Sequence, residues 1–363
     1  MMLHRFTVPF KFTFTFTVTF TILFLLSFAC LLRTTFSWSI ITMSKASGMS
    51  DSFPVSTRQA LIQKAKSLQL TKGSYSTIGW SNRLGTTITP ASIPGVFTAD
   101  RPFYWNNIDV GCRMTIIQLE TKDPNTGKPY LWIHSPVRLD GPLIQTIHKL
   151  GTVQHVISPN YEHVAFAYQW AKQYPTATMW ACPGMMARHA EVNWTYEIPS
   201  GARPDYNYNY NYTWGDSIQA IHVDCEVNPF TGKPFFNEVI FFHLPSATLM
   251  TTDLFWNYPK SDGVTNSNYE TVVGKQDDFG NWDLAPSVQN IPIGSNLWKL
   301  GMDKVFAPFY MNLMVQKQPK LQDIVKHILD EWNPTTLIPA HGDVIRGKTL
   351  IQNVLQKHFG TIQ

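Results

Sequence analysis

Residues 130–163 read YLWIHSPVRLDGPLIQTIHKLGTVQHVISPNYEH, and this stretch decides the fold. Its two short apolar runs, 130–134 and 153–157, are typical of buried strands. Between them, Asp140-Gly141-Pro142 is a typical helix start and Gly151 a typical helix end. The stretch therefore predicts a strand, a helix and a second strand, which ends at the polar sequence 158–163.

The neighbouring residues extend this pattern in both directions. Residues 114–119 predict a strand that reaches 130–134 through a turn at 123–127. A stripe of apolar residues predicts a helix over 163–174, and a strand follows at 177–181. Residues 112–182 thus run β-β-α-β-α-β, which indicates an α/β fold with helices layered on a sheet.

The second half repeats the theme of strand followed by helix. Strands are predicted at 237–244 and 248–252, with a break at Pro245-Ser246. An amphipathic helix at 321–332, a strand at 336–339 and a last helix around 350–355 complete the chain. We expect two β/α halves in one domain that covers 96–363, with insertions near 185–232 and 259–296.

The N-terminal 95 residues divide into a leader and an extension. Residues 12–32 carry no charge and follow basic residues, which is typical of a signal peptide, and 33–50 are basic and rich in Ser and Thr, as in a transit peptide. A leader over 1–50 of this kind would direct the protein to a plastid. Ordinary secretion and translation from Met43 or Met49, which would give a cytosolic protein, are the alternatives. Residues 51–95 form an extension with one predicted helix, which begins at the capping box 56–59.

Charge and cysteine content exclude several classes of protein. The chain has 29 Lys and Arg and 25 Asp and Glu, and four of the basic residues lie in the leader. The remaining body holds 25 of each sign, so no basic surface indicates a nucleic-acid partner. Its three cysteines, Cys112, Cys182 and Cys225, are too widely spaced for a disulfide framework or a structural zinc site. We expect buried thiols in a reducing compartment.

Polar residues that follow predicted strands mark the candidate site. Glu162-His163 follow the strand 153–157, Asp253 follows 248–252, and His341 follows 336–339. Groups at strand ends can converge on one edge of a sheet, and imidazole with carboxylate suits Zn²⁺ or Fe. His243 lies near a strand end as well and is a further candidate ligand. Each residue alone has an ordinary structural interpretation, so the prediction rests on their joint order.

These motifs together resemble the metallo-β-lactamase superfamily. Residues 131–136 and 156–163 are similar to its opening half, 242–254 to its acidic motif, and 338–342 to its last histidine motif. More specifically, 134–136 and 158–160 resemble a lactamase-like family of unknown function from photosynthetic organisms and bacteria. The resemblance covers about residues 96–350 and implies a four-layer αββα sandwich, here with the N-terminal extension.

The resemblance also implies a metal site, from which this sequence departs. The superfamily's first motif is His-x-His-x-Asp-His, and here Ser158 and Asn160 stand in place of its two leading histidines. The resemblance therefore implies a single metal ion, Zn²⁺ or Fe, held by His163, Asp253 and His341, with His243 as a further ligand. Glu162 is the expected fourth ligand or general base. Asn160 is expected either to orient a substrate carbonyl or water, or to cap the helix that carries His163.

Two functions follow from these expectations. The first is a mononuclear metal-dependent hydrolase of an ester, thioester, amide or phosphodiester, acting on a small molecule. The second is a catalytically inactive scaffold or ligand-binding protein of the plastid, whose pocket holds a ligand without turnover and requires no metal ion. No stable membrane insertion is expected once the leader is removed, whereas a retained leader would make the protein membrane-anchored.

Overall fold

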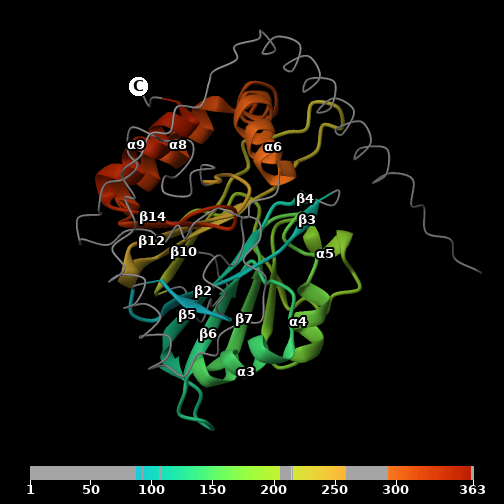
Figure 1. Cartoon of the computed structure of the whole chain (residues 1–363), viewed down its shortest axis with the longest axis vertical. Coiled ribbons are helices and arrows are strands. Elements are labelled where there is room, and N and C mark those ends of the chain that lie inside the picture. The colour runs from blue at the N-terminus through green and yellow to red at the C-terminus, as the bar shows by residue number, and fades with distance from the viewer. Residues whose placement is uncertain are drawn as a thin grey trace, which may run out of the picture.

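The computed structural model describes residues 87–91, 93–105, 108–204, 214, 216–258 and 293–360 (Figure 1). The leader over 1–50, the capping box at 56–59 and residues 259–292 of the insertion predicted near 259–296 lie outside the described residues. No helix among the described residues is both long and apolar enough to cross a bilayer.

The first sheet has seven strands in the order β1-β2-β5-β6-β7-β8-β9. Pairing is antiparallel from β1 to β6 and parallel from β6 to β9. Its strands are β1 (Thr89–Pro90), β2 (Val96–Arg101), β5 (Cys112–Lys122), β6 (Pro129–His134), β7 (Thr152–Ser158), β8 (Thr178–Ala181) and β9 (Tyr196–Glu197). A separate two-stranded pair consists of β3 (Tyr104–Trp105) and β4 (Ile108–Asp109).

Two helices connect the parallel strands of this sheet, as the pattern over 112–182 predicts. Helix α3 (Gly141–Leu150) starts where Asp140 accepts a hydrogen bond from the backbone N–H of Leu143 at 2.9 Å. It ends at Gly151, where a Cβ atom would overlap the carbonyl of Pro129. Helix α4 (Ala167–Gln173) is shorter than the predicted helix over 163–174. The short helix α5 (Met185–Arg188) follows β8.

The second sheet has five strands in the order β10-β11-β12-β13-β14. Only β12 and β13 pair in parallel. The strands are β10 (Ile218–His222), β11 (Val239–His243), β12 (Thr248–Thr251), β13 (Thr336–Pro339) and β14 (Ile345–Arg346), and the turn η1 (Leu244–Ser246) joins β11 to β12. Strand β10 lies within the insertion predicted near 185–232.

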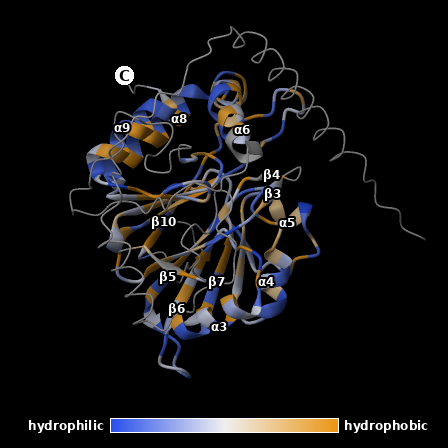
Figure 2. Ribbon diagram, in the orientation of Figure 1, coloured by the Kyte–Doolittle hydropathy of each residue, from blue (hydrophilic) through white to orange (hydrophobic). Residues whose placement is uncertain are grey.

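Helices from the C-terminal third cover this second sheet (Figure 1). A helical run of four segments comes first, then a long helix that ends in π geometry, then the last helix. They are α6 (Ile293–Gly301), η3 (Met302–Phe306), α7 (Ala307–Phe309), η4 (Tyr310–Met314), α8 (Gln318–His327), η5 (Ile328–Trp332) and α9 (Lys348–Phe359). In Figure 2, α8 and α9 carry both hydrophobic and hydrophilic residues, as amphipathic surface helices do.

The two sheets pack face to face through a buried core. Trp132 and Ile157 of the first sheet belong to the same cluster as Phe241 and Met250 of the second. The rings of Trp132 and Phe241 meet edge to face with their centroids 5.1 Å apart. Because successive strand residues point to opposite faces, the outer face of each sheet is left for the helices.

Each outer face has a hydrophobic core of its own. On the first sheet, Val156 packs in one cluster with Ile147 of α3 and Trp170 of α4. On the second, Leu249 packs in one cluster with Ile324 of α8. The order of layers is therefore helix, sheet, sheet, helix, and the expected αββα sandwich is confirmed.

Candidate metal centre

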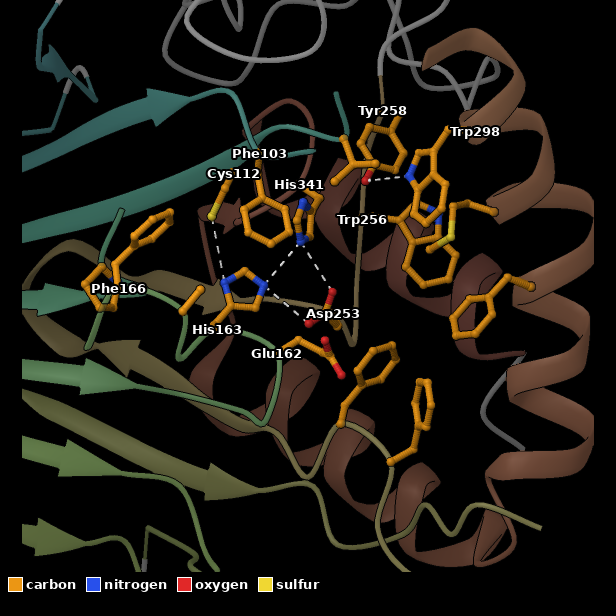
Figure 3. Close-up of a pocket in the computed structure, with 17 residues that line it drawn as sticks. Phe103, Cys112, Glu162, His163, Phe166, Asp253, Trp256, Tyr258, Trp298 and His341 are labelled. Atoms are coloured by element: carbon orange, nitrogen blue, oxygen red, sulfur yellow. Dashed lines mark hydrogen bonds and ion pairs between the residues drawn. The ribbon is translucent and has the colours of Figure 1, made fainter. Parts of the chain in front are cut away.

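Three side chains from both sheets meet at one edge of the sandwich (Figure 3). His163 follows β7, Asp253 follows β12 and His341 follows β13. The ligand atoms of the three residues all lie within 4.8 Å of one another. The sequence-based expectation that these strand ends converge is met for all three residues.

The distances within the cluster match those between ligands of one ion. His163 Nε2 lies 3.2 Å from His341 Nε2. Each of these nitrogens lies 3.3 Å from a different carboxylate oxygen of Asp253. Atoms bound tetrahedrally at 2.0–2.1 Å from a Zn²⁺ ion would be about 3.3–3.4 Å apart. Two imidazoles and one carboxylate also suit ferrous iron. The residues present therefore fit a single Zn²⁺ or Fe ion.

Both histidines present the same nitrogen to the cluster because the other is occupied. His341 Nδ1 lies 2.7 Å from the carbonyl oxygen of Gly111, which can only accept, so Nδ1 carries the hydrogen. His163 Nδ1 lies 2.7 Å from Ser135 Oγ and 3.9 Å from Cys112 Sγ. Two Nε2 lone pairs 3.2 Å apart would repel each other, and a cation or a proton between the two nitrogens removes this repulsion.

A turn held by Asn160 brings His163 to the cluster. Asn160 Oδ1 accepts hydrogen bonds from the backbone N–H groups of Glu162 and His163 at 3.0 and 2.9 Å. Its amide nitrogen donates to Thr252 Oγ1 at 2.9 Å and to Asp253 Oδ2 at 2.7 Å. Because the turn over 161–166 is held in this way, α4 begins only at Ala167 and the prediction of a helix from 163 is wrong.

Buried Glu238 holds the loop that carries Asp253. Its carboxylate accepts hydrogen bonds from the backbone N–H groups of Thr252, Asp253 and Leu254 at 2.7–2.8 Å. Burial and the negative charge of Asp253 raise the pKa of Glu238 to about 7. Glu238 thus positions a ligand without belonging to the cluster.

The loop of His341 is fixed to Asn257. The backbone N–H of Asn257 donates to the carbonyl of His341 at 3.0 Å, and that of Asp343 donates to the carbonyl of Asn257 at 2.7 Å. Gly342 between them has φ +91°, and a Cβ atom there would overlap the backbone of Asn257. Only glycine allows this close approach.

Charges within the cluster shift the protonation of its members. Burial of His163 opposes its protonation, but the charge of Asp253 and its hydrogen bond outweigh burial and raise the pKa of His163 well above its usual value. Burial of Asp253 acts against ionisation in the same way, yet His163 and His341 lower the pKa of this carboxyl. Without an ion, the cluster is therefore a site that retains protons, for which a metal ion must compete.

A pocket of about 240 Å³ opens beside the cluster, and His163, Asp253 and His341 lie in its wall (Figure 3). Glu162 is exposed at this pocket, as expected of a residue that contacts substrate or ion. Partial desolvation of its carboxyl by the pocket wall, together with the charge of Asp253, raises the pKa of Glu162. Cys112 also lines the pocket, and like Cys182 and Cys225 it is a buried free thiol.

The geometry contradicts two of the predicted roles, that of His243 as a metal ligand and that of Asn160 as a substrate contact. His243 lies at the η1 end of β11, where it pairs with Thr248 at the start of β12, whereas Asp253 follows the other end of β12. Its Nδ1 contacts Ser246 Oγ at 2.6 Å, and burial lowers the pKa of His243 to about 4. The prediction of His243 as a ligand is therefore wrong. Asn160 is fully buried and its amide is fully hydrogen-bonded, so it positions ligands rather than contacting substrate.

Sequence reasoning missed the residues that support the ligands. Ser135 directly follows the predicted strand 130–134 and has φ +55°, which is unusual for a residue other than glycine. Glu238 is an acid inside a predicted strand, and this was the one available signal of its burial. Gly111 contributes only its backbone carbonyl, which no side-chain pattern reveals.

Comparisons with solved structures find similarities at low sequence identity. Solved structures similar to it include the DIM-1 metallo-β-lactamase exposed to ceftazidime, at 9% identity over 75% of this chain and 94% of that one, with a TM-score of 0.42. The metallo-β-lactamase FIM-1 from Pseudomonas aeruginosa in its mono-zinc form matches at 10% identity over 74% and 95%, with a TM-score of 0.40. The rubredoxin oxygen:oxidoreductase from Desulfovibrio gigas matches at 12% identity over 74% and 60%, with a TM-score of 0.44.

A search of curated proteins gives no match. The profile of one family matches residues 95–279, just over half of the 363 residues. This matched range contains His163 and Asp253 and ends before His341. The chain belongs to the family described as domain of unknown function (DUF4336).

Proposed function

We propose that this protein is a mononuclear metal-dependent hydrolase. The observation that carries the proposal is the convergence of His163, Asp253 and His341, the residues that would hold the ion. The two Nε2 atoms lie 3.2 Å apart, and each lies 3.3 Å from one of the two carboxylate oxygens of Asp253. A bound Zn²⁺ ion supplies Lewis acidity that lowers the pKa of water toward about 7 and polarises a carbonyl group.

The chain's own residues supply the other parts of such a reaction. Glu162 faces the pocket and its pKa is raised toward neutrality, so its carboxylate is suited to accept a proton and return it. Asn160 and Glu238 fix the turn of His163 and the loop of Asp253, so the ligands need no rearrangement on binding. The apolar remainder of the pocket limits the access of bulk water.

Metal analysis of purified protein tests the proposal. We expect one equivalent of zinc or iron per chain, and loss of that equivalent in His163→Ala and in His341→Ala. His148→Ala is the matched control, because His148 is exposed on α3 and belongs neither to the cluster nor to the pocket lining. Metal content that stays unchanged in both ligand variants would contradict the proposal.

A non-catalytic scaffold is the second candidate, and one observation favours it. Of the two positions that hold leading histidines in the superfamily's first motif, one is Ser158, which is fully buried, and the other is Asn160, whose amide is committed to the turn. Metal-dependent turnover of any substrate in a panel of esters, thioesters, amides and phosphodiesters would exclude this candidate.

We also propose that the mature protein acts in a plastid, which the composition of residues 1–50 supports. N-terminal sequencing of the native protein tests this, with an expected start near residue 45–50. An intact leader, or a fusion protein that accumulates in another compartment, would contradict it.

A further inference from the structure

Aromatic side chains form most of the wall of the pocket beside the cluster. In Figure 3, Trp256, Tyr258 and Trp298 lie on one side of Asp253 and His341, and Phe166 lies on the other side of His163. Phe103, Phe235, Phe236, Phe306 and Met302 complete this apolar lining. Such a wall gains free energy by contact with hydrocarbon, and its phenylalanine and methionine side chains offer no hydrogen-bond partner to a polar group that enters it.

Carboxyl groups outnumber cationic groups in the described lining of the pocket, and the protonated imidazole of His163 is paired with Asp253 at 3.3 Å. Its lining includes the carboxyl groups of Glu162 and Asp253, and no lysine or arginine among the described residues lines it. The nearby Arg113 is committed elsewhere, since its guanidinium pairs with Asp100 at 2.9 Å and donates to the carbonyls of Pro339 and Gly342. A carboxylate or phosphate on a ligand would therefore meet no lysine or arginine in the described lining, and the His163 imidazolium there is already paired with Asp253.

The volume of the pocket limits the size of its ligand. A space of about 240 Å³ lies below the roughly 300–1,000 Å³ of pockets that take drug-sized ligands. This suits one aromatic ring or a short hydrocarbon chain with a single polar group.

We propose that the pocket binds an uncharged ester or lactone whose apolar part has the size of one ring, and that anionic esters such as phosphodiesters are excluded. The ester assignment rests on the proposed hydrolase function, whereas the selection against charge rests on the pocket alone. In the reaction, the oxygen of water bonds to the acyl carbon and the acyl–oxygen bond breaks. Glu162 takes the proton that water releases and the leaving alkoxide receives it, so that one acid and one alcohol are formed.

Binding of benzamide, benzoate and phenyl phosphate to the full-length chain tests the selection against charge. The three probes share one ring and differ in charge, and Trp256 and Trp298 provide a fluorescence signal from the pocket wall. With chelator present, at pH 8, we expect benzamide to bind at least about tenfold more tightly than either anion, because an unpaired charge in an apolar site is costly. Equal affinities, tighter binding of an anion, or no binding of benzamide would overturn the inference.

A substitution that adds a positive charge makes the test sharper. Ala165 is exposed and lines the pocket, so Ala165→Arg places a guanidinium beside it with little effect on the core. We expect this variant to lose most of the preference for benzamide over benzoate. The matched control is Ala187→Arg on α5, which is exposed and not part of the pocket lining, and it should behave like the unaltered protein. A preference that Ala165→Arg leaves unchanged would contradict the charge argument.

Turnover separates this inference from the proposed function. With zinc supplied, we expect hydrolysis of phenyl acetate and none of phenyl phosphate. A protein that binds no zinc but still prefers benzamide would refute the hydrolase and leave the selection against charge standing. A zinc-loaded protein that hydrolyses phenyl phosphate and not phenyl acetate would refute the selection against charge and leave the hydrolase standing.

Discussion

Replacement of Asn160 by alanine should weaken both the fold and the metal centre. The amide is fully buried and makes five hydrogen bonds. Its oxygen accepts from the N–H groups of Glu162 and His163, and its nitrogen donates to Thr252, Asp253 and, at 3.4 Å, Glu238. Each buried N–H group left without a partner costs about 1–3 kcal/mol, and a hydrogen bond to a charged group is worth about 1.5–3 kcal/mol.

Two unpartnered N–H groups and one lost hydrogen bond to the charged Asp253 together cost roughly 4–9 kcal/mol. Water that enters the vacated space recovers a part of this free energy. We therefore expect Asn160→Ala to lower the free energy of unfolding by about 3 kcal/mol or more. Since Asn160 supports two ligands from outside the cluster, we also expect zinc affinity to fall about 10- to 100-fold.

Urea unfolding and zinc calorimetry measure the two effects. Asn193→Ala is the matched control, because Asn193 is exposed in a loop, and its change should stay within about 0.5 kcal/mol. Asn160→Asp keeps the acceptor oxygen but turns the donor that faces Asp253 into a second carboxylate oxygen, so its defect should diminish as pH falls and the pair shares a proton. A loss below about 1 kcal/mol in Asn160→Ala, with zinc affinity unchanged, would refute the assigned role.

Three further predictions concern pH and backbone geometry. Because the pKa of His163 is raised in the metal-free cluster, zinc must displace its proton, and zinc affinity measured by calorimetry should rise about tenfold per pH unit between pH 6 and 7; a flat profile would contradict this. Burial lowers the pKa of His155 to about 4, so its contribution to stability is complete above pH 6.5 and is lost as pH falls toward 4. When the pH falls from 7 to 5, the free energy of unfolding measured in urea should therefore decrease by about 2 kcal/mol less in His155→Gln than in the unaltered protein. Equal decreases in the two proteins would show that His155 is protonated in the folded state. Gly342→Ala should cost about 2 kcal/mol or more, since φ +91° and overlap with Asn257 both disfavour a side chain, and a smaller loss would mean that the loop can shift.

The sequence predicted the core elements of the fold because their signals are local. Apolar alternation marked β5 and β6, and Asp140 with Gly151 marked the ends of α3. The helical run over 293–314 was not predicted. Its first four residues fall within the insertion expected near 259–296, and no element was predicted for the rest.

The candidate site was predictable only where strand order alone fixes position. His163, Asp253 and His341 each follow the carboxyl end of a strand, and those ends meet at one edge. His243 also ends a strand, but β11 runs antiparallel to β12, so its end lies at the opposite edge. The position of Glu238 follows from the same pairing, since the start of β11 lies beside the end of β12; without the register, its contact with the loop of Asp253 could not be inferred.

The ligands are divided between the two halves of the sandwich, since His163 follows the first sheet and the other two follow the second. An ion bound by all three would therefore cross-link the halves as a disulfide does, but reversibly. The supply of metal would then determine how often the two sheets separate transiently, and therefore how fast proteases degrade the protein. A cell that withholds the metal would clear this protein faster, without any change in its synthesis.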